Sequence, residues 1–540
     1  MVANSPGYMV YYDVYQNDQK VSRNPMEILV QNGVAFLSRP EEKIQTYLDF
    51  GRKEQVTLLS HENRLYKSIL PFSELPQASA ENKPDTVLGY PLHKYNFSSF
   101  SNSIETWSTT ALPFAISPNG SFVAPGNGAI LRLRINGNRV WQAAKIEPLN
   151  SAFVRDYDYA TATTISAAEM EEMKILSRYQ IVKVFEEERI NFEDLQSPKN
   201  IAQLQSGQTY RFASGTVILK KINISEWKGK NVSVFARLTC RSDGDAYDRT
   251  GAIFMIPART AGKSLLNGLV DGAHTMPGFK ANNNEEYFGM VKVPGFEPAI
   301  EWMRFFTSFG VGHFNTRRVI NNYPWAAEAY YKQEVTSLFP DDQDEIWVGA
   351  YIGNYDKGGH MVNLELDIYP GNQRDSTSRY IDPVFNAVNI LEMAGQRYAR
   401  FYRGDTLDVE FDLPAGLQNA YLLYTPTGHG GWGRGDEFVP RQHQLIVDEK
   451  PFFNMVPWRT DCATYRLINP ASGNFGSGLS SSDLSRSNWC PGTLTLPALI
   501  PLKDLAPGKH RLQVVIDQGP DEGTSFSFWN VSGVVIGEKL

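Results

Sequence analysis

Short runs in which apolar and polar residues alternate dominate this chain. Three of the clearest are residues 232–238, 362–368 and 512–516, where an apolar side chain occupies every second position. A period of two is typical of an antiparallel strand with one buried face. Gly, Pro, Asn and Asp separate the runs, and many short strands with such turn signals favour sandwiches or jelly rolls. The pattern predicts an all-β protein.

Asn-Gly pairs predict tight hairpin turns between some of these strands. Both residues tolerate a positive φ, which the two-residue hairpin loop requires. The pairs are Asn32–Gly33, Asn119–Gly120 and Asn136–Gly137. The last pair lies within LRLRINGNRVW and is the clearest of the three.

One helix interrupts the strands and helps to divide the chain. Ser166 and Glu169 form a capping box, which satisfies free backbone N–H groups at a helix start, so a helix over 167–178 is predicted. The charged stretch at 186–200 is typical of a linker, and polar turn residues break the pattern again at 371–382. The predicted divisions are an N-terminal β-rich domain (1–150), a helix and linker (151–200), and two further β domains (201–372 and 373–540).

Length and composition narrow the class of protein. A chain of 540 residues is too long for one hydrophobic core, and 42% apolar with 21% charged residues is ordinary for soluble proteins. A net charge of -7 predicts no broad surface for nucleic acid. No apolar run approaches the ~20 residues of a membrane span, so no membrane association is expected. The N-terminal MVANSPGYMVYYDV lacks a signal-peptide pattern, which fits a leader replaced by Met1 or a cytosolic protein.

Metal ligands are sparse in the sequence. No two of the eight histidines stand at i, i+2 or i, i+4, the spacings that put two imidazoles on one face of a strand or helix. Three cysteines occur, and three cannot all pair within one chain. Cys462 and Cys490 can form one disulfide, which leaves Cys240 as a buried thiol. The absence of C-x-x-C excludes a zinc ribbon.

Two turn-rich segments carry candidate chemistry. SDGDAYDR (242–249) follows a predicted strand, and its acidic residues fit a solvated turn, a catalytic loop or a calcium loop, although the bidentate Glu of a calcium loop is missing. The glycine-dense segment 428–437 allows backbone to approach a ligand, and its Trp432 can stack on a sugar. No Lys-Ser/Thr follows, so it is not a phosphate loop; the alternative is a flexible surface loop.

Between about residues 205 and 540, five segments resemble the bacterial peptide-N-glycosidase F family in the same order. They are similar to its Trp-Asp-Arg, its Leu-Pro, Ala-Tyr-Leu and Gly-x-Gly-His succession, its spaced Glu, Arg and His, its Arg-x-x-Trp-Cys-Pro-Gly and its last strand. In this chain they are Tyr247-Asp248-Arg249, the run from Phe411 through Ala420 to His429, Glu437 with Arg441 and His443, Arg486 to Gly492, and FSFWNVSGVVIG. Residues 1–150 match none of these motifs.

The resemblance implies a fold and an activity. The expected fold is all-β, with two adjacent eight-stranded antiparallel jelly rolls, the site at their junction, and a separate β-rich N-terminal domain. The expected reaction is hydrolysis of the amide between asparagine and the first N-acetylglucosamine of an N-linked glycan, giving aspartate and a glycosylamine. The expected partners are N-glycosylated peptides and glycoproteins. No cofactor or metal, a secreted or periplasmic location and a monomeric state are also expected.

The resemblance also implies roles for individual residues. Asp248 would be the principal catalytic carboxylate and Glu437 its partner across the cleft. One carboxylate can act as base or nucleophile while a second donor assists the leaving group, and an arginine stabilises the developing charge. The substrate-binding residues would be Arg249, Arg486, Trp489, His429, Tyr355 and Gly353, and the disulfide Cys462–Cys490.

Two departures from the family pattern stand out. The family's disulfide around its catalytic aspartate is missing, since only Cys240 lies nearby. A third active-site Glu, two residues before a Trp, aligns without gaps to Gly353, with Tyr355 at the Trp; a gap would bring Asp356 in instead. In the family's best-known member that Glu lies close to the first sugar, and glycans with α1,3-fucose on that sugar are refused. A glycine there predicts tolerance of this fucose.

Two other functions compete with the amidase. A non-catalytic glycan-binding protein could share the fold, because fold does not fix function, but Asp248 and Glu437 are both retained. A copper monooxygenase has a similar pair of jelly rolls, but closely spaced histidine pairs are absent. The amidase is therefore the leading hypothesis.

Overall fold

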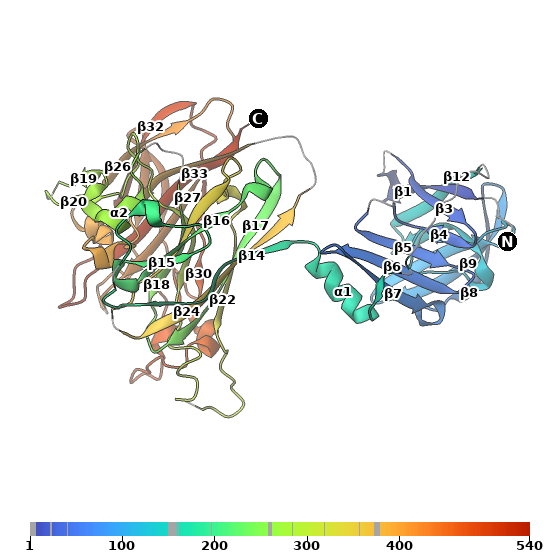
Figure 1. The fold of residues 1–540 in the computed structure, drawn as a ribbon, viewed down its shortest axis with the longest axis horizontal. Coiled ribbons are helices and arrows are strands. Elements are labelled where there is room, and N and C mark those ends of the chain that lie inside the picture. The colour runs from blue at the N-terminus through green and yellow to red at the C-terminus, as the bar shows by residue number, and fades with distance from the viewer. Residues whose placement is uncertain are drawn as a thin grey trace. The chain divides into compact units, whose positions relative to one another are not determined.

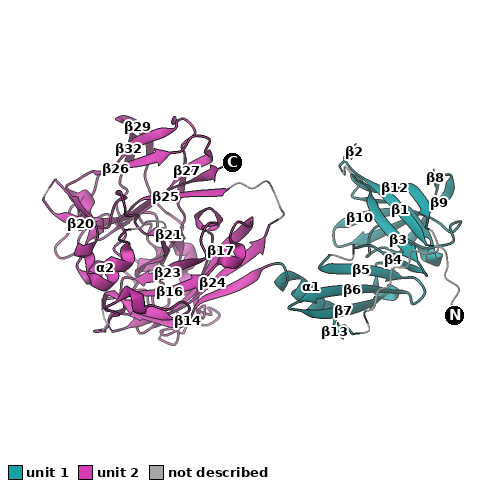
Figure 2. Ribbon diagram, turned by 45° about the horizontal axis from the view of Figure 1, so that its top comes forward, with its two compact units in different colours: residues 1–178 teal, residues 179–540 magenta. Residues whose placement is uncertain are grey.

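The computed structural model describes most of the chain as two compact units. The described residues are 7–21, 24–39, 42–149, 159, 161–195, 197–257, 262–282, 284–317, 319–355, 357–371, 378–431 and 433–539. The units are residues 1–178 and 179–540 (Figure 2). Trp432 and Asp356, which the sequence singled out, lie outside the described residues. No described helix is both long enough and apolar enough to span a bilayer.

The first unit is built on one 13-stranded sheet in the order β13-β7-β6-β5-β4-β3-β1-β12-β11-β10-β9-β8, with β2 paired to β1. Its strands are β1 (Tyr8–Gln16), β2 (Gln19–Lys20), β3 (Met26–Gln31), β4 (Val34–Phe36), β5 (Ile44–Asp49), β6 (Glu54–His61), β7 (Arg64–Pro71), β8 (Ser79–Val87), β9 (Tyr90–Ser99), β10 (Asn102–Thr109), β11 (Ala129–Ile135), β12 (Arg139–Pro148) and β13 (Thr163–Thr164). Val10, Tyr12 and Leu131 are among its buried core residues.

Two of the three predicted Asn-Gly turns join strands. Asn32–Gly33 connects β3 to β4 and Asn136–Gly137 lies between β11 and β12, with all four residues at positive φ. The prediction for Asn119–Gly120 is wrong, because that pair lies in the long connection between β10 and β11. There the Asn119 side chain accepts from the Ser121 backbone N–H at 2.9 Å, a local bond that makes a turn without a strand ladder.

The predicted helix is present, but part of the predicted linker is a strand. Helix α1 (Ala167–Leu176) begins at Ser166 with the expected capping box. Strand β14 (Gln180–Asn191) follows it and pairs with β24 (Gly359–Pro370), so residues 186–191 belong to a sheet. The charges of this stretch point outward while Phe185 and Ile190 are fully buried. A positive φ at Glu187 marks a bulge that disrupts the alternation and hides the strand from sequence inspection.

The second unit contains two sandwiches, and the first has sheets in the orders β14-β24-β17-β22 and β15-β16-β23-β18-β21-β30. Its further strands are β15 (Thr209–Phe212), β16 (Val217–Asn223), β17 (Val232–Asp243), β18 (Thr250–Ile256), β21 (Ile300–Phe306), β22 (Ala329–Glu334), β23 (Glu345–Ile352) and β30 (Leu494–Thr495). The alternating runs 232–238 and 362–368 are confirmed as neighbouring antiparallel strands β17 and β24. Helix α2 (Leu265–Asp271) and the hairpin β19 (Gly278–Lys280)–β20 (Glu286–Phe288) follow β18 and precede β21 in the chain, and Figure 1 labels them together at one side of the unit.

The second sandwich has sheets in the orders β25-β33-β27-β31 and β26-β32-β28-β29. Its strands are β25 (Ser378–Asn386), β26 (Leu407–Leu413), β27 (Gln418–His429), β28 (His443–Val447), β29 (Lys450–Met455), β31 (Ala498–Pro501), β32 (Gly508–Ile516) and β33 (Phe528–Lys539). The predicted strand 512–516 is part of β32. The all-β prediction with two jelly rolls and an N-terminal β domain is confirmed, although the described sheets of the first jelly roll hold ten strands instead of eight, one of them β30 from the C-terminal part of the chain.

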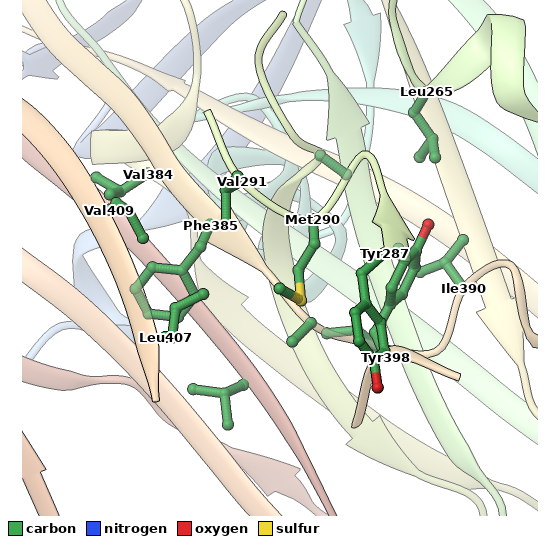
Figure 3. Packing of buried hydrophobic residues seen from close by; sticks show 14 of the residues in the cluster. Leu265, Tyr287, Met290, Val291, Val384, Phe385, Ile390, Tyr398, Leu407 and Val409 are labelled. Atoms are coloured by element: carbon green, nitrogen blue, oxygen red, sulfur yellow. The ribbon is translucent and has the colours of Figure 1, made fainter. Parts of the chain in front are cut away.

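The two jelly rolls share their hydrophobic interiors. One cluster joins Phe254 of the first to Phe385 and Leu407 of the second, and Figure 3 shows the latter two near Met290. A hydrogen bond from a buried charge also crosses the junction: Arg304, which pairs with Glu301 on the same strand β21, donates to the Thr427 hydroxyl of β27 at 2.8 Å. Apolar burial and a fully partnered buried charge together hold the facing loops in a defined position.

Candidate active site

The loop between β17 and β18 carries Asp248 and is held by the carboxylate of Asp245. The Asp245 side chain has no exposed surface and accepts from the Tyr247 backbone N–H at 2.9 Å. It also accepts from Arg249 Nε at 2.8 Å and from Asn354 Nδ2 at 2.6 Å. A carboxylate with this many donors is fixed in orientation, and it fixes the residues on both sides of Asp248.

Glu437 ends the glycine-rich loop that follows β27. Gly430 and Gly431 have φ values of 83° and 75°, which residues with a side chain rarely adopt, so the backbone conformation of this loop favours glycine at both positions. The neighbouring Asp436 is buried and accepts from Trp529 Nε1 at 2.9 Å and Arg441 Nε at 2.8 Å. The sequence of segment 428–437 fits either a ligand-binding loop or a flexible surface loop. The contacts of Asp436 fix the end of this segment, next to Glu437.

Arg486 brings the two predicted catalytic carboxylates together. Its Nε lies 3.0 Å from Oε1 of Glu437, and its Nη2 lies 3.4 Å from Oδ2 of Asp248. Nη2 also donates to the Ser481 carbonyl at 2.9 Å. The guanidinium is 1% exposed, and its buried Nη1 has no hydrogen-bond partner among the described residues. One donor group of this arginine therefore lacks an acceptor among the described residues.

Burial changes the protonation of both carboxyl groups. It raises the pKa of Asp248 to about 6, against the opposing effect of Arg486. It raises the pKa of Glu437 to about 7, and the negative charge of Asp248 adds to this while Arg486 opposes it. Two nearby carboxyl groups whose pKa values lie close to neutrality are suited to proton transfer.

Arg249 lies between two exposed aromatic rings beside Asp248. Its guanidinium carbon is 5.0 Å from the Tyr247 ring centre and 5.2 Å from that of Tyr355, and the two tyrosines are 59% and 53% exposed. Flat, exposed rings around a cation offer both a stacking surface and hydrogen-bond donors. The structure thus places Arg249 and Tyr355, both predicted from the sequence, in one cluster.

Glu392 is a carboxylate at this cluster that sequence reasoning missed. It lies in a short 3-10 helix of the second jelly roll, Glu392–Ala394, and accepts from the Tyr355 hydroxyl at 2.9 Å. Burial raises the pKa of Glu392 above its ordinary value. No local motif marks this residue, since its contact with Tyr355 joins two jelly rolls. Only the three-dimensional arrangement identifies it.

Trp489 and His429 lie behind Arg486. Trp489 is 2% exposed, its Nε1 donates to the Gly428 carbonyl at 2.8 Å, and its ring lies 4.6 Å from the Arg486 guanidinium carbon. His429 is 5% exposed and packs between Phe306, Phe528 and this tryptophan. Burial holds the pKa of His429 well below its usual value. Trp489 therefore packs against Arg486, and His429 packs against Trp489. Contact of either ring with substrate stays a prediction.

Gly353 follows β23 and has little space around it. Its N–H donates to the Thr250 carbonyl at 3.0 Å, and a Cβ added at this position would lie 2.9 Å from the Tyr351 hydroxyl. A larger side chain would therefore require Tyr351 to shift by a few tenths of an ångström.

The disulfide expected from the family resemblance is present. Cys462 and Cys490 are bonded with their Cα atoms 5.1 Å apart, and Cys240 is a buried free thiol. The one group of candidate metal ligands in the described part of the chain is Asp461 with these two bonded cysteines. Their sulfur atoms are joined to each other, so they are not available as thiolate ligands.

Comparisons with known proteins agree with the motifs. The N-terminal and C-terminal domain families of peptide-N-glycosidase F match residues 181–368 and 397–536. Two solved structures of PNGF-II, in space groups P21 and C2, are 37% identical, cover 99% of both chains and have TM-scores of 0.83 and 0.76. The structure of PNGase F from Flavobacterium meningosepticum is 15% identical, covers 67% of this chain and 96% of that chain, and has a TM-score of 0.45. No curated protein sequence gives a significant match. The chain therefore belongs to the peptide-N-glycosidase F family, and the protein is an enzyme of the N-glycanase class.

Proposed function

We propose that this enzyme hydrolyses the amide bond between asparagine and the first N-acetylglucosamine of N-linked glycans, giving aspartate and a glycosylamine. The observation that carries the proposal is the bridge from Arg486 to both Glu437 and Asp248, at 3.0 and 3.4 Å. Amide hydrolysis needs a base, an acid and a positive charge near the carbonyl oxygen, and this cluster contains all three.

Burial raises the pKa of both carboxyl groups towards neutrality, so the pair can share one proton at the working pH. In the proposed mechanism Asp248 is the base towards water and Glu437 is the proton donor to the departing glycosylamine. In this mechanism Arg486, whose Nη1 has no hydrogen-bond partner among the described residues, binds the oxygen that becomes negative as water adds. Asp245 keeps Arg249 and the loop of Asp248 in position.

The first sugars of the glycan would bind at the two tyrosines. The exposed faces of Tyr247 and Tyr355 fit sugar rings, and Arg249 between them fits ring oxygens or the N-acetyl carbonyl. Glu392 supports Tyr355 and supplies a carboxylate in this region, where the gapless alignment puts Gly353 at the position of the family's third Glu. His429 and Trp489 act through Arg486.

Tolerance of a core α1,3-fucose is the finer part of the proposal. A glycine at position 353 presents no side chain to such a sugar, and steric exclusion cannot be offset by small gains elsewhere. The test compares cleavage of a plant-type glycopeptide carrying this fucose by wild type, Gly353→Ala and Gly353→Glu. The alanine variant controls for displacement of Tyr351. Wild type and Gly353→Ala are expected to cleave it and Gly353→Glu is not; an uncut substrate with wild type refutes the steric argument.

The location and the first unit complete the proposal. A disulfide persists in an oxidising compartment, and this supports action outside the cytoplasm, secreted or periplasmic. The monomeric state stays a prediction. The first unit is an accessory domain that affects access of large substrates and not the chemistry. Residues 179–540 without it are expected to cleave a short glycopeptide at nearly the full rate; loss of this activity in a folded truncation contradicts the idea.

One experiment separates the proposed amidase from a glycan-binding protein and from a metal enzyme. A denatured N-glycoprotein is incubated with the protein in EDTA, with the Asp248→Asn variant as control. A mobility shift together with conversion of the glycosylated asparagine to aspartate supports the amidase. Binding without release would favour the lectin-like alternative, and release that EDTA abolishes would favour a metal enzyme.

A further inference from the structure

The loop between β23 and β24 is joined to the loop of Asp248 by a buried amide side chain. Asn354 is fully buried, and its Nδ2 donates to Oδ2 of Asp245 at 2.6 Å. At the other end of the same loop, the Asp245 backbone N–H donates to the Gly359 carbonyl at 3.4 Å. Two loops that are distant in the sequence are therefore fastened to each other at two points.

The residues next to these contacts carry the proposed chemistry. Asp245 also accepts from Nε of Arg249, the residue that follows Asp248, at 2.8 Å. Tyr355 directly follows Asn354, and its ring centre lies 5.2 Å from the Arg249 guanidinium carbon. The contact between Asn354 and Asp245 therefore ties the catalytic carboxylate on one loop to the proposed sugar-binding ring on the other.

A buried histidine fixes the orientation of this amide. His360 is 1% exposed and lies at the start of β24, with its Nδ1 3.4 Å from Nδ2 of Asn354. Burial lowers the pKa of His360 to about 4, so near neutral pH the ring is uncharged and its Nδ1 can accept the second N–H of the amide. A flipped amide would turn its oxygen towards the Asp245 carboxylate. One orientation of the Asn354 side chain is therefore favoured.

Packing alone does not account for an asparagine at this position. Oδ1 of Asn354 and Nε2 of His360 are buried and have no hydrogen-bond partner among the described residues. An unpaired buried polar atom costs free energy, and an apolar side chain of the same shape would avoid this cost. What the N–H groups of Asn354 hold in place explains the amide better than a gain in stability does.

We propose that Asn354 is a positioning residue of the reaction, whose amide holds the loop of Asp248 against the loop of Tyr355. His360 orients this amide. The inference rests on the proposed amidase function and goes beyond it, because both residues are buried and act through Asp245. A sugar that stacks on Tyr355 then brings the scissile amide to Asp248 in a fixed geometry. A misplacement of about 1 Å in such a geometry costs about 10²-fold in rate.

Two substitutions that keep the shape of the side chain test this role. Asn354→Leu removes the donor at every pH. In Asn354→Asp a protonated carboxyl group can still donate to Asp245, whereas an ionised one repels it, and burial beside Asp245 raises the pKa of the new group. The described ionisable groups around the site are Asp243, Asp245 and Arg249 from the end of β17 and its loop, and His360 from β24.

The expected results are ratios to wild type at the same pH, measured as release of glycan from one labelled glycopeptide. In Asn354→Leu, kcat/KM falls about 10²-fold at both pH 5 and pH 9, mainly through kcat. In Asn354→Asp it falls less than about threefold at pH 5 and approaches the leucine variant at pH 9. One sample of Asn354→Asp is moved between the two pH values below its melting temperature, so that regained activity separates positioning from unfolding.

Asn363→Asp is the matched control, because Nδ2 of this β24 residue also donates to a carboxylate, that of Glu187, at 2.8 Å. It is expected to keep the wild-type rate and pH profile. His360→Phe keeps a ring without an acceptor and is expected to lower kcat/KM less than Asn354→Leu; an unchanged rate would remove His360 from the proposal.

Other results overturn the proposal. A lower melting temperature of Asn354→Leu with unchanged kcat/KM would make the role of the residue structural only. A loss in Asn354→Asp that does not depend on pH, or a fall confined to KM, would also contradict positioning of Asp248. If wild type itself releases no glycan, the amidase function has failed and this inference fails with it, which differs from an active wild type with unaffected variants.

Discussion

Replacing Arg486 by lysine tests the centre of the proposed mechanism. At an effective dielectric constant of about 20, each contact of the guanidinium with Glu437 and Asp248 corresponds to about 5 kcal/mol of gross attraction at the observed 3.0 and 3.4 Å. A lysine ammonium is a point charge and cannot contact both carboxylates and also present a donor equivalent to Nη1. Loss of one donor to a developing oxyanion reduces kcat by about 10²–10³-fold, or about 3–4 kcal/mol.

The pH profile gives a second readout of Arg486→Lys. The arginine opposes the rise in the pKa of both carboxyl groups, so weakening its contacts moves these pKa values further up. A base must be deprotonated to act, so the acid limb of kcat/KM shifts to higher pH by about one unit or more. The assay is release of glycan from a labelled glycopeptide between pH 4 and 9, with thermal unfolding as a check of the fold. Arg511→Lys, in an exposed ion pair with Asp408, is the control. A fall below threefold with an unchanged acid limb refutes the reasoning.

Three further predictions follow from the same geometry. Asp248→Asn abolishes glycan release while the melting temperature stays within a few degrees, because a carboxamide cannot act as a base; most of the activity remaining would move the base to Glu437. Glu437→Gln is expected to be inactive. Its free energy of unfolding at pH 8 exceeds that of wild type by about 3 kcal/mol, and the difference is absent at pH 4. Equal denaturation midpoints of the two proteins at pH 8 would contradict the raised pKa of Glu437. The sign follows from a folded pKa of about 7 against an ordinary 4.5, since the folded state then binds the proton more tightly and wild type loses stability as pH rises through this window. Reduction of the Cys462–Cys490 disulfide, which closes a loop of 28 residues, lowers the free energy of unfolding by about 3–4 kcal/mol. Thiol counting in the denatured, unreduced protein finds one free thiol, and a count of three would refute the bond.

Regular alternation allowed most of the strands to be predicted, and local irregularity hid the rest. Strand β17 shows an unbroken period of two in burial, and β24 shows it over residues 361–366, because one face of each is buried there. The sequence predicts a linker over residues 186–200, although β14 continues to Asn191, since the bulge at Glu187 moves charged residues out of register with the buried ones. Asn119–Gly120 predicts a hairpin turn between strands, whereas the Asn119 side chain itself makes a local turn. Bulges and side-chain turns depend on neighbouring strands that a sequence does not identify.

Sequence motifs identified some residues of the site, and only the packing of distant segments identifies the others. Asp248, Glu437 and Arg486 belong to motifs that survive in this chain, so the resemblance identified them, and the structure places them together. Glu392 belongs to no such motif, and its contact with Tyr355 depends on how two jelly rolls pack. The burial of Trp489 and His429 could not be predicted either, because burial is a property of the assembled core.

The active site has an energetic cost that the fold must offset. Holding Asp248 and Glu437 where burial raises their pKa values means that, above neutral pH, two negative charges are kept close together in a poorly solvated position. One guanidinium, itself 1% exposed, compensates for both. Each of the three residues comes from a different loop, and these loops cannot relax independently because Asp245, Asp436 and Ser481 anchor them through hydrogen bonds. Apolar burial in the shared interior of the two jelly rolls offsets the unfavourable free energy of keeping these two carboxylates buried. Separating the jelly rolls would therefore abolish the catalytic arrangement even if each sandwich remained folded.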